Sequence, residues 1–487
     1  MSRSLTIVYD DREAPPVEIE SIIGSARFSE ILHRRISLGE TIRREVRRGG
    51  ASDFFHLLDP RDAKHLAELA ESGSDTHIFL LLPSSFMPTN PEGLANLVAK
   101  AAFALRSTFA MKTTNGEGPV LLLRNDLVAL LRAPNPATAR EILLHLSQQA
   151  PAMLDHCGFV DLRQPDAFID FINGATESRH FNAIRIDRHV FSKTSTDRDK
   201  MAREYAFFGL APERMKPFLI TSFDFFDDGA RAGYSTERLA VPDAALQLIH
   251  RAFDEGSFGA LVETFFAFLA ARPVKPMERE GVRAVARDAI LGKMHQRLDL
   301  LLTTAPGRRL DALLVEAGPY GGIASMRERA AALIEAAIAR DPSDALAFGH
   351  GDPCLSNILF DRRTRLFRLI DPRGARNDAE AWMHPLYDLA KFSHSVLGGY
   401  DFVNNDLFEC SLDAELKFVL RLHDDGPPAS FRAILERHLA ETGLDLGIVR
   451  AYELSLFMSM MPLHIDHPRK LAGFAMLAAR IIRELEA

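Results

Sequence analysis

Three polar side chains in the segment GHGDPCLSNILFDRRTRLFRLID, residues 349–371, could together carry out phosphoryl transfer. They are Asp352, Asn357 five residues later, and Asp371 nineteen residues after Asp352. One carboxylate can accept the proton of an attacking hydroxyl, while an amide oxygen and a second carboxylate suit Mg²⁺ on nucleotide phosphates. These residue types therefore indicate a phosphotransfer site if the fold brings them together.

Two short apolar runs must position these side chains. The runs ILF and LFRLI flank a charged turn at residues 361–365, and this pattern predicts a β-hairpin leading into Asp371. The hairpin would place the loop of Asp352 and Asn357 at the same end as Asp371.

The spacing also resembles a known signature, that of the aminoglycoside phosphotransferase/choline kinase family, the small-molecule branch of the protein-kinase-like fold. The signature H-G-D-x-x-x-x-N, followed by a strand ending in I-D, is matched by HGDPCLSN at residues 350–357 and by ID at 370–371. The resemblance implies ATP as donor, Asp352 as catalytic base, and Asn357 and Asp371 as Mg²⁺ ligands. It also implies that His350 braces the loop.

Residues 176–240 resemble the small lobe of that fold. Lys193 ends an apolar strand, and Glu204 lies in a helix expected at residues 199–207. In the family a strand lysine paired with a helix glutamate orients the α- and β-phosphates. Glu213 and Lys216 are alternates for this pair.

The remaining nucleotide contacts are less well defined. Two strands joined across Asp-Asp-Gly at 227–229 form a hairpin signal, and in the family the second strand leads to the hinge that bonds adenine through its backbone. Thr236, Glu237 and Arg238 would be that hinge here. The covering loop, expected near residues 176–182, contains no glycine, so its phosphate contacts stay unassigned.

Residues 241–487 would be the large lobe, with helices up to the catalytic loop and again over the last hundred residues. Asp388 matches a second family feature, an aspartate that braces the catalytic loop. Arg373 could touch a phosphate or an acidic substrate, or pair with a neighbouring acid. His464 and Asp466 could bind substrate hydroxyls, or they belong to a turn between core helices.

Residues 1–175 are expected to form a separate α/β domain with a mostly parallel sheet, because strand-like runs alternate with helical ones, among them a helix over residues 91–109. Its place ahead of the kinase-like domain suggests a degenerate nucleotidyltransferase-like domain. A Gly-rich turn should follow the first strand of such a domain, but DDREAPP stands there. Asp10 and Asp11 could bind a metal or form a solvated turn. A basic helix expected within residues 28–48 could bind an anion or be a solvated face.

The composition limits the class of protein. A net charge of −8 argues against nucleic acid or an anionic membrane as the main partner, and no run reaches the length of a membrane helix. Three widely spaced cysteines form neither a disulfide framework nor a zinc pattern. No apolar signal segment follows Met1, so a cytoplasmic location is expected.

These observations predict an ATP- and Mg²⁺-dependent kinase acting on a hydroxyl of a small molecule. The pairing of IDPRG with YDLAKFSHSVLGGYDF resembles the subset of the family linked to bacterial capsule or lipopolysaccharide sugar pathways, which favours a sugar acceptor. An aminoglycoside, choline or homoserine acceptor is an alternative. An aminoglycoside would require an acidic pocket, to which Asp424, Asp425 and Asp466 could contribute. A non-catalytic nucleotide-binding scaffold and a bifunctional sugar-activating enzyme are two further alternatives.

Overall fold

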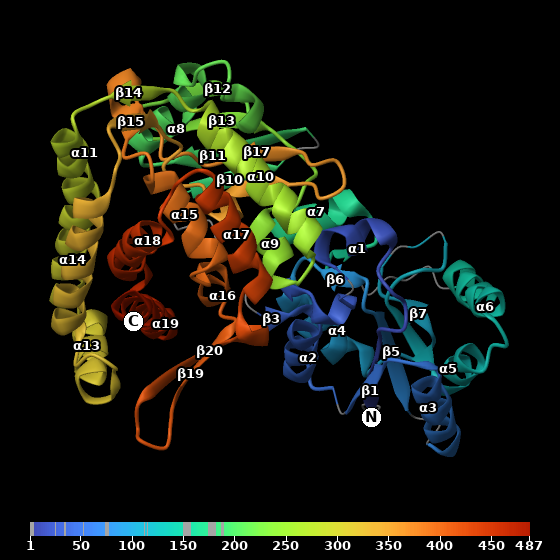
Figure 1. Cartoon of the computed structure of the whole chain (residues 1–487). Helices are drawn as coiled ribbons and strands as arrows, with labels where there is room; N and C mark the ends of the chain where they lie inside the picture. Colours follow the sequence, from blue (N-terminus) through green and yellow to red (C-terminus); the bar gives the residue numbers. More distant parts are fainter. Residues whose placement is uncertain are drawn as a thin grey trace. The chain divides into compact units, whose positions relative to one another are not determined.

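The computed structural model describes residues 4–24, 26–33, 36–51, 53–73, 77–111, 113, 115–149, 157–173, 182–186 and 189–487 (Figure 1). The chain divides into two compact units, Met1–Glu177 and Ser178–Ala487. The covering loop expected at residues 176–182 falls outside the described residues, apart from the backbone of Asn182.

Unit 1 contains a five-stranded sheet with the strand order β4-β1-β5-β8-β7. The three neighbours β4, β1 and β5 are parallel, as expected, whereas β8 pairs antiparallel with both β5 and β7, so the sheet is mixed. The strands are β1 (Leu5–Asp10), β4 (Asp53–Leu57), β5 (Ile78–Pro83), β7 (Thr108–Phe109) and β8 (Val120–Leu123).

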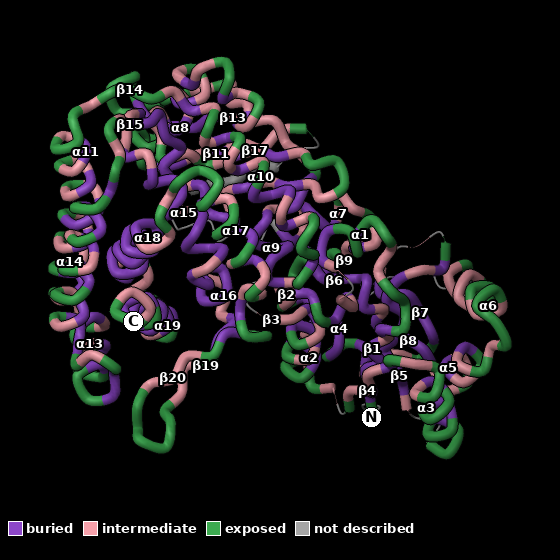
Figure 2. The backbone as a smooth tube through the Cα atoms, in the orientation of Figure 1, coloured by how far each residue is buried: buried purple, intermediate pink, exposed green. Residues whose placement is uncertain are grey.

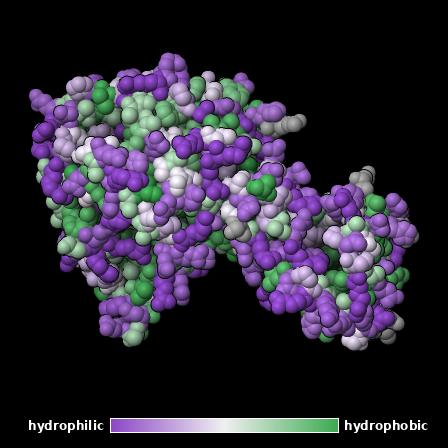
Figure 3. Space-filling view, turned by 45° about the vertical axis from the view of Figure 1, so that its right-hand side comes forward, coloured by the Kyte–Doolittle hydropathy of each residue, from purple (hydrophilic) through white to green (hydrophobic). Residues whose placement is uncertain are grey.

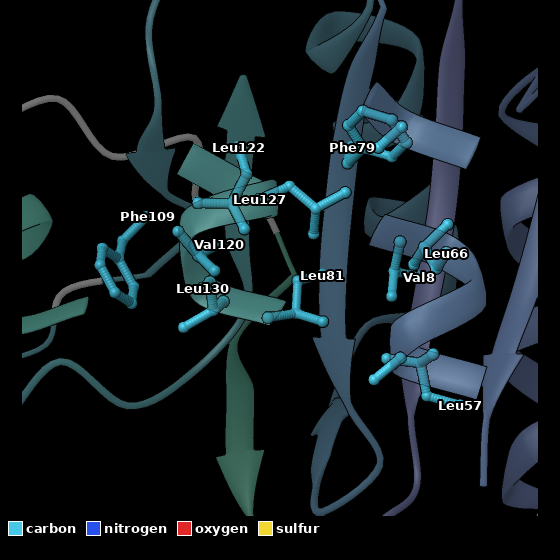
Figure 4. Packing of buried hydrophobic residues seen from close by; sticks show 12 residues of the cluster. Val8, Leu57, Leu66, Phe79, Leu81, Phe109, Val120, Leu122, Leu127 and Leu130 are labelled. Atoms are coloured by element: carbon cyan, nitrogen blue, oxygen red, sulfur yellow. The ribbon is translucent and has the colours of Figure 1, made fainter. Parts of the chain in front are cut away.

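One face of this sheet carries a hydrophobic core (Figure 4). Val8 of β1, Phe79 and Leu81 of β5, and Val120 and Leu122 of β8 point to the same side, because alternate residues of a strand share a face. Helices α3 (Pro60–Ser72), α5 (Arg124–Leu131) and α6 (Pro136–Gln149) supply the residues that cover them.

The other elements of unit 1 include two that correct the sequence expectations. The helix expected over residues 28–48 begins only at Leu38, because Ser37 caps α2 and its hydroxyl accepts from the Glu40 amide. The helix expected over residues 91–109 ends at Ala101. The remaining elements are α1 (Val17–Ile23), η1 (Phe28–Glu30), β2 (Leu32–His33), β3 (Ile36–Ser37), α2 (Leu38–Arg48), β6 (Phe86–Pro88), α4 (Pro91–Ala101), β9 (Phe159–Asp161) and α7 (Pro165–Asn173).

Unit 2 begins with a four-stranded antiparallel sheet in the order β10-β11-β13-β12. Helix α8 packs on it, and Met201 of the helix lies in one buried cluster with Ala232 and Tyr234 of β13. The elements are β10 (Asn182–Ile186), β11 (Val190–Ser195), α8 (Arg198–Leu210), η2 (Lys216–Phe218), β12 (Ser222–Asp227) and β13 (Ala232–Glu237). This sheet with one helix, followed by a mainly helical region, is the layout expected of a kinase-like fold.

Helix α18 is the central element of the helical region. It is buried along nearly its whole length, as Figure 2 shows, and packs against α12, α14, α15 and α19. The most apolar run of the sequence, residues 454–463, is therefore core over most of its length, whereas Leu463 at its end is 51% exposed. The helices are α9 (Ala244–Ile249), α10 (Glu255–Ala271), α11 (Arg279–Ala286), the π-helical turn η3 (Arg287–Gly292), α12 (Lys293–Thr303), α13 (Ala305–Ala317), α14 (Ile323–Arg340), α15 (Tyr387–Val396), α16 (Tyr400–Asn404), α17 (Ala429–Glu441), α18 (Leu446–Met460), η7 (Met461–His464) and α19 (Pro468–Glu486).

Short strands complete unit 2. The hairpin predicted before Asp371 is present as an antiparallel pair, β16 with β17. The expectation that the last hundred residues are all helical is wrong, because a second hairpin, β19 with β20, lies there. These elements are β14 (Val274–Pro276), β15 (Ala345–Phe348), η4 (Leu355–Asn357), β16 (Ile358–Phe360), β17 (Phe367–Leu369), η5 (Asp378–Ala381), β18 (Trp382–Met383), β19 (Phe408–Leu412), β20 (Phe418–Leu422) and η6 (His423–Asp425).

Hydrophobic residues on the face seen in Figure 3 occur in small groups between hydrophilic ones, as is usual for a folded protein surface. Among the described residues, no helix combines the length and apolar character that a membrane crossing requires.

Candidate active site

The loop predicted to be catalytic, residues 349–357, begins where β15 ends, at Phe348. It is called the catalytic loop below. Gly351 has φ +83°, and a Cβ built on it would lie 2.6 Å from the Cβ of Arg373. Both the left-handed backbone and the close approach require glycine here. The tight turn brings Asp352 out of the core directly after the buried His350.

Asp388 of α15 fixes the backbone of this loop through hydrogen bonds. Its fully buried carboxylate accepts the backbone N–H of His350 at 3.0 Å and that of Gly351 at 2.7 Å. The buried guanidinium of Arg272 lies 3.0 Å from the same carboxylate. Asp388 therefore lies where a loop-bracing residue must, and Arg272 supplies the charge that allows it to be buried.

His350 stays inside the core. It has no exposed surface, its Nδ1 accepts from the Asp352 amide at 3.3 Å, and its ring meets Phe207 edge-on. Burial lowers the pKa of His350, although the nearby carboxylates, led by Asp388, oppose the shift. A buried imidazole that accepts the Asp352 amide fits the loop-bracing role expected of His350.

Asp352 lies beside a lysine that the sequence reading did not single out. The Lys391 ammonium is 2.9 Å from Oδ1 of Asp352, and that oxygen is shielded from solvent while 39% of the side chain is exposed. Lys391 thus engages Oδ1, which leaves Oδ2 as the carboxylate oxygen without that contact. Burial by itself would raise the pKa of Asp352, but the charge of Lys391 more than offsets it and lowers the pKa.

Asn357 closes the loop onto the hairpin. Its side-chain amide nitrogen donates to the backbone carbonyl of Asp352 at 2.9 Å, and its backbone carbonyl accepts the N–H of Ile370 at 3.0 Å. The side-chain nitrogen is thus committed to the loop, which leaves the amide oxygen as the atom available to a cation.

Asp371 links the catalytic loop to the small sheet. Its Oδ1 lies 3.2 Å from Nζ of Lys193, and the same ammonium lies 2.9 Å from Oε2 of Glu204. The Tyr234 hydroxyl donates to that glutamate oxygen at 2.9 Å. Burial would lower the pKa of Lys193, but Asp371 and Glu204 more than offset it and raise the pKa.

The backbone around Asp371 is also specialised. Asp371 adopts φ +53°, a conformation uncommon for residues other than glycine and frequent at functional sites. Ala375, just beyond it, donates its N–H to the carbonyl of Arg203 on α8 at 3.1 Å. The segment after Asp371 is thereby attached to the helix that carries Glu204.

The donor set around Asp371 fits Mg²⁺ held jointly with phosphate. It offers one partly exposed carboxylate, 47% exposed, and one amide oxygen, which are hard oxygen ligands. Within the described ranges, no group of three or more His, Cys, Asp and Glu residues gathers to hold an ion by itself. Such a site suits an ion that keeps phosphate oxygens and water as its other ligands.

The hinge candidates Thr236, Glu237 and Arg238 end and follow β13, the strand between β11 and β12. The backbone N–H of Glu237 donates to Thr221 at 3.3 Å, and that of Arg238 donates to His189 at 3.0 Å. Two of the three donors are thus already used within the sheet. An adenine contact by these residues stays a prediction.

The alternates Glu213 and Lys216 bond to each other at 2.5 Å, with 89% of the glutamate side chain exposed. They form a surface pair outside the Lys193 cluster. Asp424 and Asp425 lie on the exposed turn η6, where Asp424 faces Arg251 at 3.9 Å.

His464 and Asp466 follow α18. The His464 ring packs against Phe474 at 4.9 Å between centroids, and Asp466 is exposed. Their predicted contact with substrate hydroxyls stays a prediction.

Arg373 is exposed, and within the described part of the chain it makes no ion pair with an acid. Its backbone N–H donates to the carbonyl of His350 at 2.9 Å, which keeps it against the catalytic loop. Of the two roles that the sequence left open for Arg373, the salt bridge to a neighbouring acid is thus not seen among the described residues. Contact with a phosphate or an acidic substrate stays a prediction.

In unit 1, the acidic pair after β1 does not form an open metal site. Asp10 bonds to Arg12 at 2.7 Å, and the fully buried Asp11 accepts from the Ser29 hydroxyl at 2.6 Å. The basic helix α2 is partly neutralised, because Arg44 and Arg48 both pair with Glu45. Arg43 of the same helix lies over the Phe54 ring, and Arg47 is in its last turn. Arg34 and Arg35, also expected on this helix, lie outside the described residues.

Comparisons with known proteins gave structural neighbours only. No family model and no curated protein matches the chain. Aminoglycoside phosphotransferase APH(4)-Ia, solved as a thermostable mutant with ADP and hygromycin B, has 11% identity and a TM-score of 0.38, covering 65% of this chain and 97% of that one.

Two further solved structures are similar to the same extent. APH(3'')-Id from Streptomyces rimosus with ADP and streptomycin has 16% identity and a TM-score of 0.33, covering 62% of this chain and 98% of that one. A putative fructosamine-3-kinase from Haemophilus somnus has 10% identity and a TM-score of 0.36, covering 66% and 96%. At TM-scores below 0.5 these similarities do not show the activity of this chain.

Proposed function

We propose that the chain is an ATP- and Mg²⁺-dependent phosphotransferase that phosphorylates a hydroxyl of a small molecule. The observation that carries the proposal is the position of the Lys193 ammonium, between Glu204 and Asp371. Lys193 and Asp371 are 178 residues apart in the sequence, yet their charged groups lie 3.2 Å apart. This contact joins the small sheet to the loop of Asp352 and Asn357, as phosphoryl transfer requires.

In this proposal each residue has a separate task. Lys193, oriented by Glu204, holds the α- and β-phosphates, while Asn357 and Asp371 hold Mg²⁺. Bound Mg²⁺ supplies positive charge to the phosphate oxygens. Asp352 accepts the proton of the acceptor hydroxyl through Oδ2, and Asp388 and His350 keep the loop in place. Positioning and charge account for most of the catalysis.

The finer assignments belong to the same proposal. Residues 176–240 act as the small lobe and 241–487 as the large lobe, with the adenine hinge at Thr236–Arg238. The acceptor is a sugar of a capsule or lipopolysaccharide pathway in the cytoplasm, and unit 1 is a degenerate nucleotidyltransferase-like domain. The lobes rest on the motif spacing at residues 350–371, the sugar acceptor on the resemblance of residues 370–374 and 387–402 to kinases of such pathways, and unit 1 on its α/β alternation. Aminoglycoside or choline kinases and a non-catalytic scaffold are the competing functions.

The test is an ATP-consumption screen with Mg²⁺ over sugars, amino alcohols and aminoglycosides, with Asp352→Ala beside the wild type. We expect turnover that is lost in Asp352→Ala while ADP affinity, measured by calorimetry, is retained. Full activity of Asp352→Ala would refute Asp352 as the base. Nucleotide binding without turnover on any acceptor would favour the scaffold, and no nucleotide binding would refute the assignment of Lys193.

A further inference from the structure

Three cationic side chains gather beside Asp352, and the roles proposed above assign none of them to the nucleotide or to Mg²⁺. Tyr387 and Lys391 are one turn apart on α15 and so share a face of that helix. The Lys293 ammonium donates to the Tyr387 hydroxyl at 3.1 Å, and Arg373 lies against Gly351 of the catalytic loop. We call Lys293, Arg373, Lys391 and Tyr387 the cationic cluster.

The backbone contains a feature that places Lys293 in this cluster. The π-helical turn Arg287–Gly292 ends immediately before Lys293 and interrupts the regular α-helical register. Such turns are rare and occur frequently at functional sites, because they change the direction in which the next side chains point. Lys293 would face another direction if the helix were regular throughout.

The charges in the cluster do not balance. Lys391 has a carboxylate partner, Asp352, but within the described ranges neither Lys293 nor Arg373 has one. Burial would raise the pKa of the Tyr387 hydroxyl, but the positive charges of Lys391, Lys293 and Arg373 lower it. The hydroxyl therefore lies in the field of all three cations. Three cations that share a single carboxylate are unfavourable unless a further anion binds among them.

We propose that Lys293, Arg373 and the Tyr387 hydroxyl bind an anionic group, a phosphate or a carboxylate, on the acceptor molecule. The inference rests on the proposed function and narrows its substrate class to anionic alcohols. Guanidinium and ammonium groups are the usual protein ligands of such groups. A polycationic acceptor such as an aminoglycoside would instead be repelled by the charges of Lys293 and Arg373.

The γ-phosphate of the donor is the other possible source of this anion. Lys193 interacts with Glu204 and Asp371, whereas Lys293 interacts with Tyr387, Lys391 and Arg373. Lys293 also comes from α12, which packs on α18 and the turn η7 rather than on the small sheet. The two lysines thus interact with different sets of residues. We assign Lys193 to the phosphates of the donor and Lys293 to the anionic group of the acceptor.

Inorganic phosphate is the probe for a binding test on the full chain. Calorimetry would compare the wild type with Lys293→Met and Arg373→Met, which keep the apolar stem, and with Lys293→Arg, which keeps the charge. Lys417→Met is the matched control, because Lys417 lies outside the cluster and bonds to the carbonyl of Glu316. The fluorescence of Trp382, the sole tryptophan, would verify that each variant is folded.

We expect phosphate affinity to fall about tenfold in both methionine variants, since a hydrogen bond to a charged group is lost. Lys293→Arg and Lys417→Met should keep it, and ADP affinity should not change in Lys293→Met. Equal phosphate affinity in all variants would overturn the inference. A parallel loss of ADP affinity would also overturn it, because the cations would then serve the donor.

A turnover assay separates this inference from the proposed function. Sugars would be compared with their phosphorylated and carboxylated counterparts, and the anionic forms should be preferred by the wild type but not by Lys293→Met. Preference for a neutral or cationic acceptor, unchanged in Lys293→Met, would overturn the inference while the kinase activity stood. No turnover, with phosphate binding still dependent on Lys293 and Arg373, would refute the kinase but support the anion site.

Discussion

The ammonium of Lys391 lies 2.9 Å from Oδ1 of Asp352, so the proposed catalytic base is paired with a lysine before any substrate binds. The pairing has two effects. It keeps the carboxylate ionised in a partly buried position, and it engages Oδ1, which leaves Oδ2 for the acceptor hydroxyl of the proposed reaction. Lys391 is thus a positioning residue that acts through Asp352.

Lys391→Met should change the pH dependence of activity. Without the ammonium, burial is no longer opposed and the pKa of Asp352 rises. A base must be ionised to act, so the acidic limb of the kcat/KM profile should move to higher pH, by about one to two units. The profile would be measured between pH 5 and 9. Lys391→Arg should restore the wild-type limb, and an unchanged limb in Lys391→Met would contradict the role.

The contacts of Glu204 lead to a prediction about nucleotide affinity. Glu204→Gln removes one of the two carboxylates at Lys193 and should weaken ADP binding about tenfold, because the lysine is less well oriented. Tyr234→Phe removes only the hydrogen bond that the uncharged hydroxyl donates to the same glutamate oxygen and should cost about 1.5–3 kcal/mol of stability. Its effect on ADP affinity should be smaller. Calorimetry would contradict the scheme if Tyr234→Phe weakened ADP binding more than Glu204→Gln.

The Arg272–Asp388 pair should be essential for the stability of unit 2. Arg272→Met leaves a fully buried carboxylate without its countercharge and should cost about 3–5 kcal/mol. The double variant with Asp388→Asn removes that charge and should be more stable than Arg272→Met alone. Urea unfolding followed by Trp382 reports this directly, since the sole tryptophan lies in unit 2. A double variant less stable than Arg272→Met would show that the uncompensated charge is not the cause.

How far the sequence predicts this structure depends on how local the information is. The loop, the hairpin and the partners Asp352, Asn357 and Asp371 were predictable because they lie within 20 residues of each other, and Gly351 enforces the turn. The Lys193–Glu204 pair was predictable because it joins one strand to the helix that directly follows it. Lys293 was not predictable, because its position depends on a π-helical turn and on packing against a helix nearly a hundred residues later.

The sequence indicates only part of the surroundings of Lys391. It follows Asp388 by three residues on a predicted helix, so the two lie near each other on its surface. Nothing local shows that Asp352 comes within reach of the lysine. The hairpin β19–β20 was missed for another reason: its turn contains no glycine, and Leu416 takes φ +59° instead. Asp413 stabilises that turn by accepting from the amides of Glu415 and Lys417.

Buried groups in unit 2 should give its stability opposing responses to acid. Burial lowers the pKa of His384 to about 4, although Asp341 at 3.3 Å opposes the shift. The unfolded chain takes up this proton near pH 6.5, so His384 costs stability as pH falls from 6.5 toward 4. Burial raises the pKa of Asp401 to about 7, so the folded chain takes up that proton first and gains stability as pH falls below 7.

The two residues can be separated by comparing the free energy of unfolding at pH 7.5 and pH 5.0, again through Trp382. His384→Gln should remove a loss on acidification of about 2 kcal/mol, so that its stability at pH 5.0 improves relative to the wild type. Asp401→Asn should remove a gain of about 2 kcal/mol and shift the difference in the opposite direction. The two shifts have opposite signs because, at pH 5.0, His384 is protonated only in the unfolded chain and Asp401 only in the folded one. A shift of the same sign in both variants would show that burial does not move the pKa of at least one of these two groups in the stated direction.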